Sequence, residues 1–301
     1  MKHKPVLLKE SIENLVIDKN GIYIDCTFGA GGHSAQILKK LTPNGRLFSF
    51  DLDEESQTIS KKIKQQNFKF TLDNFKNISN YFCENQVSGV LVDCGVSSPQ
   101  LDTSHRGFSF NKDAPLDMRF GKTIRNDAKK IVNNYSIDEL TSIFKNFGQE
   151  EESRKIAKQI SIEREKNEIQ TTFQLAGLIR KTKKKYTKNN PATKVFQAIR
   201  MEINDEAGNL RGCLKALEKI LKNHGRALII TFHSIEDRII KDFISTDIPF
   251  HERDLPLKDD LGAKSKFKLL TTIFPSAQEL QSNKRSRSAK LRVLEKYENL
   301  I

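Results

Sequence analysis

The stretch Gly89-Val-Leu-Val-Asp-Cys-Gly-Val-Ser-Ser-Pro-Gln100 joins a short apolar run to an acid and a polar loop. Such a run is typical of a strand in the middle of a parallel sheet that is covered on both faces. Open α/β sheets bind ligands beyond the carboxyl ends of these strands. We therefore expect Asp93, Ser97, Ser98 and Gln100 to lie where chemistry takes place.

Similar β-rich runs alternate with amphipathic stretches on both sides of this segment. Strands are expected at 22–24, 47–50, 68–70 and 90–92, with helical stretches at 33–41, 54–65 and 75–83 between them. A further strand, 226–232, is followed by an amphipathic stretch at 235–244. This alternation predicts an α/β fold with a parallel sheet.

Between these two blocks the sequence becomes polar and helical. Ser136-x-x-Glu139 and Thr171-x-x-Gln174 are capping-box patterns that precede apolar helix faces. We predict an inserted all-helical domain at 104–204 within a core formed by 1–103 and 205–301.

The return to the core is predicted to be one long amphipathic helix over 196–221, with Gly208 or Gly212 as the point of any bend. Two β-rich runs, 267–274 and 289–297, then predict a closing antiparallel hairpin. Its connection contains the basic run Lys284-Arg-Ser-Arg287.

The composition favours an acidic partner. Lys and Arg number 51 against 38 Asp and Glu, a net charge of +13, which suits RNA or a membrane surface and also matches a lysine-rich proteome. No apolar stretch is long enough for a membrane span and the N-terminus does not resemble a secretory signal, so we expect a cytoplasmic protein that does not enter a membrane. The four cysteines form no Cys-x-x-Cys pair, so we expect buried free thiols and no metal site.

A glycine turn follows the first predicted strand, in Asp25-Cys-Thr-Phe-Gly-Ala-Gly-Gly-His33. Glycines let the backbone approach a ligand, and the following helix start offers free N–H groups. A dinucleotide fingerprint would need a glycine where Ser34 stands, so an NAD-type pyrophosphate binder is the weaker alternative.

Two further strand ends complete the pattern of a nucleoside site. Asp51 ends the second strand, where an acid can accept the hydroxyl groups of an adenosine ribose. Phe75 follows the third strand and can pack on an adenine face, although a phenylalanine here is also a common core residue. An adenosyl cofactor without a pyrophosphate fits this set best.

Eight motifs in order resemble the bacterial 16S ribosomal RNA cytosine-N4 methyltransferases, the MraW family, over essentially the whole chain. They are Asp25-x-Thr-Phe-Gly-x-Gly-Gly-His-Ser34, Asp93-x-Gly-Val-Ser-Ser-Pro-Gln-Leu-Asp102, Arg106-Gly-Phe-Ser-Phe110, Pro115-Leu-Asp-Met-Arg119, Pro191-Ala-Thr193, Phe196-Gln-Ala-x-Arg200, Phe232-His-Ser-x-Glu-Asp-Arg238 and Arg285-x-Arg-Ser288.

The resemblance implies a class I, Rossmann-like methyltransferase core with an inserted helical domain for RNA recognition. It implies S-adenosylmethionine as cofactor and the N4 amine of a cytidine near the decoding region of 16S rRNA as target, within the 30S subunit; a homodimer is one option for the oligomeric state. Carried over by motif, the cofactor contacts are Gly31, Gly32, His33, Asp51, Phe75, Asp93 and Gln100.

A cytosine amine is a poor nucleophile because its lone pair is delocalised into the ring, so the enzyme must hold and aim it. Many amino-methylating enzymes do this with an Asn or Asp, two prolines and an aromatic residue, which the loop 93–100 lacks. We therefore expect Ser97, Ser98 and backbone carbonyls of this loop to accept hydrogen bonds from the amine. The alternative is that the two serines only shape the turn. His233 after the fifth strand is a further candidate for contact with the nucleotide; a Ser-His-acid hydrolase is disfavoured because no Gly-x-Ser-x-Gly motif is present.

The basic runs 180–188 and 284–287 are candidates for contacts with RNA phosphates, or for solvated faces. Phe108 and Phe110 are candidates for stacking on an extruded base, or for packing between core and insertion. A non-catalytic RNA-binding assembly factor is the alternative outside enzymes.

Overall fold

The computed structural model describes residues 5–183, 190–245 and 266–297. The chain divides into two compact units, which we call the sheet unit and the helical unit. Val96–Glu206 forms the helical unit, and the described residues up to Gly95 and from Ala207 onward form the sheet unit. The helical unit begins before residue 104, the boundary expected from the sequence, because Val96 and Leu101 pack against its apolar core.

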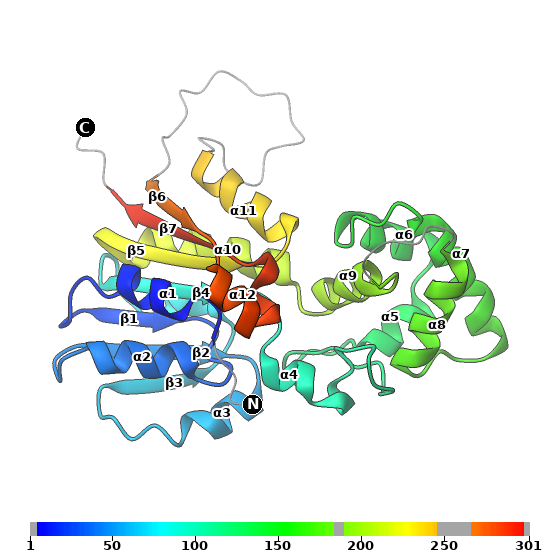
Figure 1. Ribbon diagram of the computed structural model, residues 1–301, viewed down its shortest axis with the longest axis horizontal. Helices are drawn as coiled ribbons and strands as arrows, with labels where there is room; N and C mark the ends of the chain where they lie inside the picture. Colours follow the sequence, from blue (N-terminus) through cyan, green and yellow to red (C-terminus); the bar gives the residue numbers. More distant parts are fainter. Residues whose placement is uncertain (1–4, 184–189, 246–265, 298–301) are drawn as a thin grey trace. The chain divides into compact units, whose positions relative to one another are not determined.

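The sheet unit is built on one seven-stranded sheet with the order β3-β2-β1-β4-β5-β7-β6 (Figure 1). Its first five strands pair in parallel, whereas β7 pairs antiparallel with both β5 and β6. The order 3-2-1-4-5 is that of a doubly wound, Rossmann-like fold, which confirms the predicted α/β class. The strands are β1 (Ile22–Asp25), β2 (Arg46–Asp51), β3 (Phe68–Leu72), β4 (Val87–Asp93), β5 (Leu221–Thr231), β6 (Phe267–Ile273) and β7 (Lys290–Lys296).

Helices cover both faces of this sheet, so the central strands are apolar on both sides. On one face, Leu91 and Leu228 belong to an apolar cluster that includes residues of α1 and α2. The alternate residues, such as Val90 and Ile229, are buried as well. The helical elements of the unit are α1 (Leu8–Leu15), α2 (Gly32–Lys40), α3 (Glu54–Ser60), η1 (Phe75–Asn80), α10 (Glu206–Ile220), α11 (Ser234–Ser245), α12 (Ala277–Ser282) and η3 (Lys284–Ser288), with Glu206 itself assigned to the helical unit.

Over its described residues, 96–183 and 190–206, the helical unit has helices as its only regular elements, apart from one isolated bridge between Pro115 and Thr171. Both predicted capping boxes are present: the side chains of Ser136 and Thr171 accept hydrogen bonds at the starts of α6 and α8. Its elements are α4 (Ser98–Asp102), η2 (Ser104–Arg106), α5 (Ala128–Asn134), α6 (Ile137–Asn146), α7 (Ser153–Lys166), α8 (Thr172–Thr182) and α9 (Thr193–Ile203). No helix within the described ranges has the length and apolarity needed to cross a membrane.

The helix predicted over 196–221 is in fact two helices, α9 and α10, which meet at Asn204 and Asp205. Asp205 has a φ of 46°, in the left-handed region that ends a helix. The buried amide of Asn204 accepts a hydrogen bond from the Phe120 N–H and donates one to the Met118 carbonyl. The prediction of one helix was wrong because these contacts come from residues more than eighty positions away.

The closing antiparallel pair is confirmed, with β6 at the edge of the sheet and β7 between β6 and β5. The connection between them contains α12 and η3, and the predicted basic run lies in η3. The cysteines are free as expected, but Cys83 is exposed and Cys94 is half-buried, so only Cys26 and Cys213 are buried thiols.

Candidate active site

Six of the seven cofactor residues expected from the sequence follow strands β1 to β4 of the sheet unit, at the carboxyl ends of those strands. Because the four strands are parallel, these ends lie along the same edge of the sheet. The seventh, Gln100, belongs to the helical unit, as do Ser97 and Ser98.

The glycine turn before α2 requires glycine at two positions. Gly31 has a φ of 77°, and a Cβ atom there would lie 2.7 Å from the ring of Phe28. A Cβ atom at Gly32 would lie 2.3 Å from Cγ of Pro5. Glycine is therefore required at both positions by close packing within the chain, and the turn leads directly into the first N–H groups of α2.

Asp51 at the end of β2 is held in place by three donors. Its Oδ2 accepts hydrogen bonds from the Gly29 N–H at 2.7 Å and the Ser56 hydroxyl at 2.9 Å, and its Oδ1 accepts one from the Asp53 N–H at 2.9 Å. A carboxylate offers about four acceptor positions, so one position on Oδ1 is left. Burial raises the pKa of Asp51 to about 6, against the lowering effect of these hydrogen bonds.

Ser34 has a structural role that the sequence did not reveal. Its hydroxyl donates to Oδ2 of the fully buried Asp25 at 2.6 Å and lies 2.8 Å from the Ser49 hydroxyl. Oδ1 of Asp25 accepts from the Thr27 N–H at 3.2 Å. Burial raises the pKa of Asp25 to about 6. The residue that replaces the third glycine of a dinucleotide fingerprint thus anchors the acid beneath the glycine turn.

His33 and Asp93 face each other across this edge. The His33 Nε2 atom lies 3.1 Å from the Val6 carbonyl, and Nδ1 lies 3.8 Å from Oδ2 of Asp93. The other carboxylate oxygen of Asp93, Oδ1, is buried and has no hydrogen-bond partner in the described part of the chain. Burial, followed by the nearby charges of Asp25 and Glu236, raises the pKa of Asp93 well above its ordinary value. Asp93 therefore has an unused acceptor in a surrounding of like charge, which suits a ligand that brings a donor or a positive charge.

Phe75 begins the 3₁₀ helix η1, where a longer helical stretch was expected. Its neighbour Asp73 accepts hydrogen bonds from the Asn77 amide at 3.0 Å and from the Tyr81 hydroxyl at 2.7 Å. The exposed Tyr81 ring also packs edge-on against Phe50, with 5.2 Å between ring centroids. Phe75 itself is half-buried, so its role toward an adenine stays a prediction.

Ser97 and Gln100 form a capping box at the start of α4. The Gln100 N–H donates to the Ser97 hydroxyl at 3.4 Å, and the Gln100 side chain accepts from the Ser97 N–H at 3.0 Å. The Ser-x-x-Gln spacing is the signal that could have revealed this pair. Ser98 is buried in the first turn of α4.

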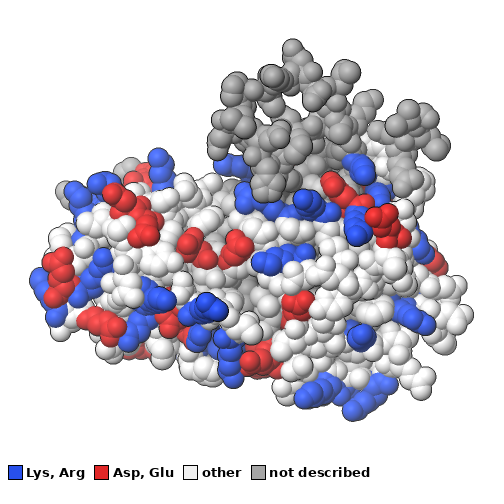
Figure 2. Space-filling model, turned by 180° about the vertical axis from the view of Figure 1, so that it is seen from behind, with Lys and Arg blue, Asp and Glu red and all other residues white. Residues whose placement is uncertain are grey.

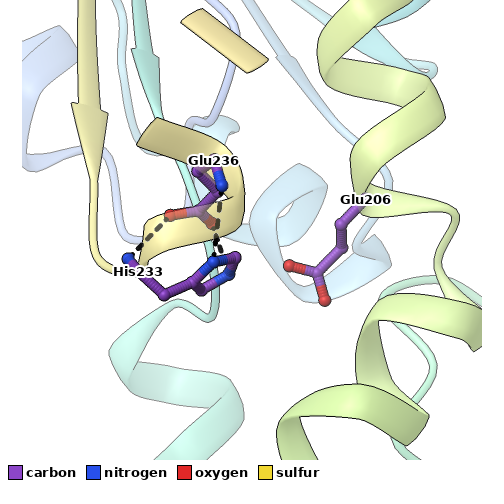
Figure 3. Close-up of side chains that lie close together, drawn as sticks. All are labelled: Glu206, His233 and Glu236. Atoms are coloured by element: carbon purple, nitrogen blue, oxygen red, sulfur yellow. Dashed lines mark hydrogen bonds and ion pairs between the residues drawn. The ribbon is translucent and has the colours of Figure 1, made fainter. Parts of the chain in front are cut away.

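His233 and Glu236 form a second reciprocal pair, after β5 (Figure 3). The Glu236 carboxylate accepts from the N–H groups of Phe232 at 2.7 Å and His233 at 3.3 Å, while the Glu236 N–H lies 3.5 Å from His233 Nδ1. Asp237 pairs instead with Arg292. A Ser-His-Asp arrangement is therefore not formed here, which argues further against the hydrolase alternative.

Within the helical unit, the motifs at 106–110 and 115–119 build the local fold. Phe108 is buried and stacks on Phe120 at 5.7 Å between centroids, and Phe110 packs edge-on against Phe196 at 5.2 Å. Phe108 thus belongs to the core of this unit, which argues against the alternative that it stacks on an extruded base.

The two basic runs differ in how their charges are used. In the run 180–188, Lys183 forms a buried ion pair of 2.7 Å with Glu150, and residues 184–189 lie outside the described residues. In the second run, Lys284, Arg285 and Arg287 are exposed. Figure 2 shows lysine and arginine side chains spread over the visible face and interspersed with acidic ones. The net charge alone therefore does not locate an RNA surface.

Comparison with known proteins yields a match over nearly the whole chain. A model of the MraW methylase family matches residues 1–297. The chain is 42% identical over 312 residues to the "Ribosomal RNA small subunit methyltransferase H" of Spiroplasma kunkelii, covering 98% of each chain. It is 43% identical to the protein of the same name from Mesoplasma florum, covering 98% of this chain and 99% of the relative. A solved structure of a putative methyltransferase from Streptococcus mutans in complex with SAH aligns over 98% of this chain and 99% of that chain, with a TM-score of 0.45 and 14% identity.

Proposed function

Because the chain belongs to the MraW methylase family, we propose that it methylates the N4 amine of a cytidine in 16S ribosomal RNA, near the decoding region of the small subunit. The observation that carries this proposal is the family match over residues 1–297, at 42% identity to relatives named as small-subunit rRNA methyltransferases. A ribosomal RNA substrate also implies the cytoplasmic location expected from the sequence.

S-adenosylmethionine is the cofactor, and it supplies an electrophilic methyl group on a sulfonium. The residues at the carboxyl edge of the sheet fit such a molecule: the glycine turn leads into the start of α2, Asp51 retains one acceptor position, and Asp93 Oδ1 is buried without a partner in the described chain. In the proposal, Gly31, Gly32 and His33 line the cofactor, Asp51 accepts from its ribose, Phe75 packs on its adenine, and Asp93 and Gln100 complete the site.

The chain's contribution to chemistry is to position the amine. Alignment of two reacting groups supplies much of the acceleration in such transfers, and no strong base is needed before attack. We assign Ser97 and Ser98, with backbone carbonyls of their loop, as acceptors that orient the amine. The capping bond to Ser97 from the Gln100 N–H is long, at 3.4 Å, and a hydroxyl oxygen has two acceptor positions, so Ser97 can accept a second hydrogen bond.

The helical unit is proposed to recognise the RNA. A paired or stacked cytidine cannot reach the methyl donor, so the target must be single-stranded or extruded, at a cost of a few kcal/mol. An assembled 30S subunit, which presents one defined RNA conformation, is the proposed substrate.

Nucleoside mass spectrometry tests the proposal. Small subunits that lack the modification are incubated with enzyme and S-adenosylmethionine, and their nucleosides are analysed for N4-methylated cytidine. The Asp93→Asn variant is the matched control, because it keeps the size of the side chain and replaces one carboxyl oxygen with an amide nitrogen. No N4-methylcytidine with the native enzyme would refute the assignment. Binding of NAD in place of S-adenosylmethionine would favour the oxidoreductase alternative, and RNA binding without methylation would favour the assembly factor.

A further inference from the structure

The basic 3₁₀ helix η3 lies at the same edge of the sheet as the candidate site. Lys290, the first residue of β7, pairs with Thr231, the last residue of β5. Because β7 runs antiparallel to β5, its first residue lies at the carboxyl end of β5, and η3 directly precedes it. The sequence run 284–287 is therefore placed beside the strand ends that carry the cofactor residues.

The backbone of η3 is held by local hydrogen bonds, which fixes where its side chains point. Ser286 is fully buried and its hydroxyl donates to the Asn283 carbonyl at 2.7 Å, while the Asn283 side chain accepts from the Arg285 N–H at 3.3 Å. Lys284, Arg285 and Arg287 flank this buried serine and are exposed. Lys284 and Arg287 make no ion pair with any residue that the structure describes.

Two more cations are gathered around one carboxylate, and one of them, Lys290, follows η3 by two residues. Nζ of Lys241 lies 3.3 Å and Nζ of Lys290 lies 3.7 Å from Oδ2 of Asp237, whose Oδ1 pairs with the buried Arg292. Asp237 is thus shared by three cations and neutralises only one of their charges. The surplus of positive charge is located on Lys241 and Lys290, which keep 65% and 39% of their side chains exposed.

We propose that Lys241, Lys284, Arg285, Arg287 and Lys290, together called the basic edge, bind phosphates of the RNA backbone beside the methyl-transfer site. This inference rests on the proposed function. Lys and Arg at such a surface hold the backbone and set its position without reading sequence. An extruded nucleotide needs its neighbouring phosphates held while the base leaves the stack, and the basic edge lies where that backbone would pass.

RNA is favoured over a membrane or an acidic protein because of this location. The basic edge is continuous, through the pairing of Lys290 with Thr231, with the strand ends that receive the cofactor. A substrate backbone must come to this edge for methyl transfer to occur, whereas a membrane or protein partner has no such requirement. The other partners become outcomes of the test.

The test measures binding of a 16S rRNA transcript over a series of salt concentrations. The Lys284→Ala/Arg287→Ala variant removes two exposed charges that have no partner in the described chain, and Lys241→Ala forms a second, independent variant. The matched control is Lys39→Ala/Lys40→Ala, which removes two exposed lysines from the last turn of α2. That turn lies at the opposite edge, because α2 runs back along the sheet after β1.

We expect the Lys284→Ala/Arg287→Ala variant to bind the transcript roughly tenfold or more weakly at physiological salt. The slope of log affinity against log salt should become shallower by about 1.4 to 1.8, the value for two lost phosphate contacts. The control should keep the native slope, and all variants should bind S-adenosylmethionine as the native protein does.

Several results would overturn the inference: a native slope in the Lys284→Ala/Arg287→Ala variant, an equal change in the control, or a matching loss of S-adenosylmethionine binding. The inference would also be overturned, in favour of a membrane partner, if the Lys284→Ala/Arg287→Ala variant lost binding to anionic lipid vesicles but bound the transcript as the native protein does. Failure of the proposed function is seen separately, as native protein that forms no N4-methylcytidine.

Discussion

The Oγ1 atom of Thr27 accepts a 2.8 Å hydrogen bond from the backbone N–H of Asp93. This bond joins the turn after β1 to the end of β4, the two segments that carry the glycine turn and Asp93. We predict that Thr27→Val, which keeps the shape and removes the acceptor, weakens S-adenosylmethionine binding by about two- to tenfold, the value of one net hydrogen bond. Titration calorimetry measures the change. Thr27→Ser keeps the acceptor and should keep near-native affinity; weakening by Ser as large as that by Val would show that the hydrogen-bond acceptor alone does not account for the effect.

Asp51 makes cofactor binding depend on pH. Its pKa is raised to about 6, and the ribose hydroxyls donate best to the ionised carboxylate. Affinity for S-adenosylmethionine should therefore fall roughly tenfold between pH 7 and pH 5, as the ionised fraction drops to about a tenth. Dissociation constants measured over this range check the prediction.

The control for this titration is Asp51→Asn, since Asp25 also has a pKa of about 6 and Asp93 is raised as well. The Asn variant should bind more weakly at pH 7 and show a flatter dependence between pH 5 and 7. A dependence as steep as that of the native protein would assign the titration to another acid.

The parts of the site that follow strand ends could be predicted from the sequence, because a buried parallel strand has a recognisable apolar run and its last residue is fixed by the change to polar residues. Asp51 and Asp93 were found in this way. The glycine turn was found because a residue with a φ of 77°, such as Gly31, tolerates little besides glycine.

Features that depend on partners distant in sequence were not predictable in this way. The end of α9 depends on Asn204 meeting Met118 and Phe120, and the burial of Lys183 depends on Glu150. Side-chain pairs of this kind leave no periodic signal. Ser97 differs, because its Ser-x-x-Gln pattern is local, but its place in a loop next to Asp93 favoured an interpretation in terms of chemistry.

Ser34→Ala tests the buried support of the glycine turn. The change leaves Oδ2 of Asp25 without its 2.6 Å donor and should destabilise the protein by about 1 to 3 kcal/mol at pH 7. Because the folded-state pKa of Asp25 is raised to about 6, the group is largely protonated at pH 5, where the lost donor matters less. Urea unfolding at pH 7 and pH 5 should thus show a smaller deficit at pH 5. An equal deficit at both values would mean that packing, rather than the charge of Asp25, is responsible.

Ser97→Gly separates the capping role of this residue from a role at the amine. Glycine is a tolerable N-cap, so α4 should lose only a few tenths of a kcal/mol, whereas Ser97→Ala should lose about 1 kcal/mol. If the hydroxyl orients the amine, both variants should lower kcat by roughly tenfold to a hundredfold with little change in S-adenosylmethionine affinity. A native kcat for Ser97→Gly would leave Ser97 as a cap alone, with Ser98→Ala as the remaining test of the loop.

Asp237 should contribute to stability in a manner that disappears in acid. Burial opposes its ionisation, but the hydrogen bond and charge of Arg292, together with Lys241 and Lys290, place its pKa below the ordinary value. Asp237→Asn leaves the buried Arg292 guanidinium without a countercharge and should cost about 3 to 5 kcal/mol at pH 7.

For an acid with a depressed pKa, the contribution to stability is present above the unfolded-state pKa near 4 and is lost as pH falls through the folded-state pKa. The deficit of the variant, measured by urea unfolding from pH 7 to pH 3, should therefore be constant down to about pH 4 and shrink below it. Asp138→Asn, which breaks the exposed 2.7 Å ion pair of Asp138 with Arg154, is the matched control and should change stability much less. A deficit for Asp237→Asn that does not shrink below about pH 4 would show that shape, and not charge, holds Arg292 in place.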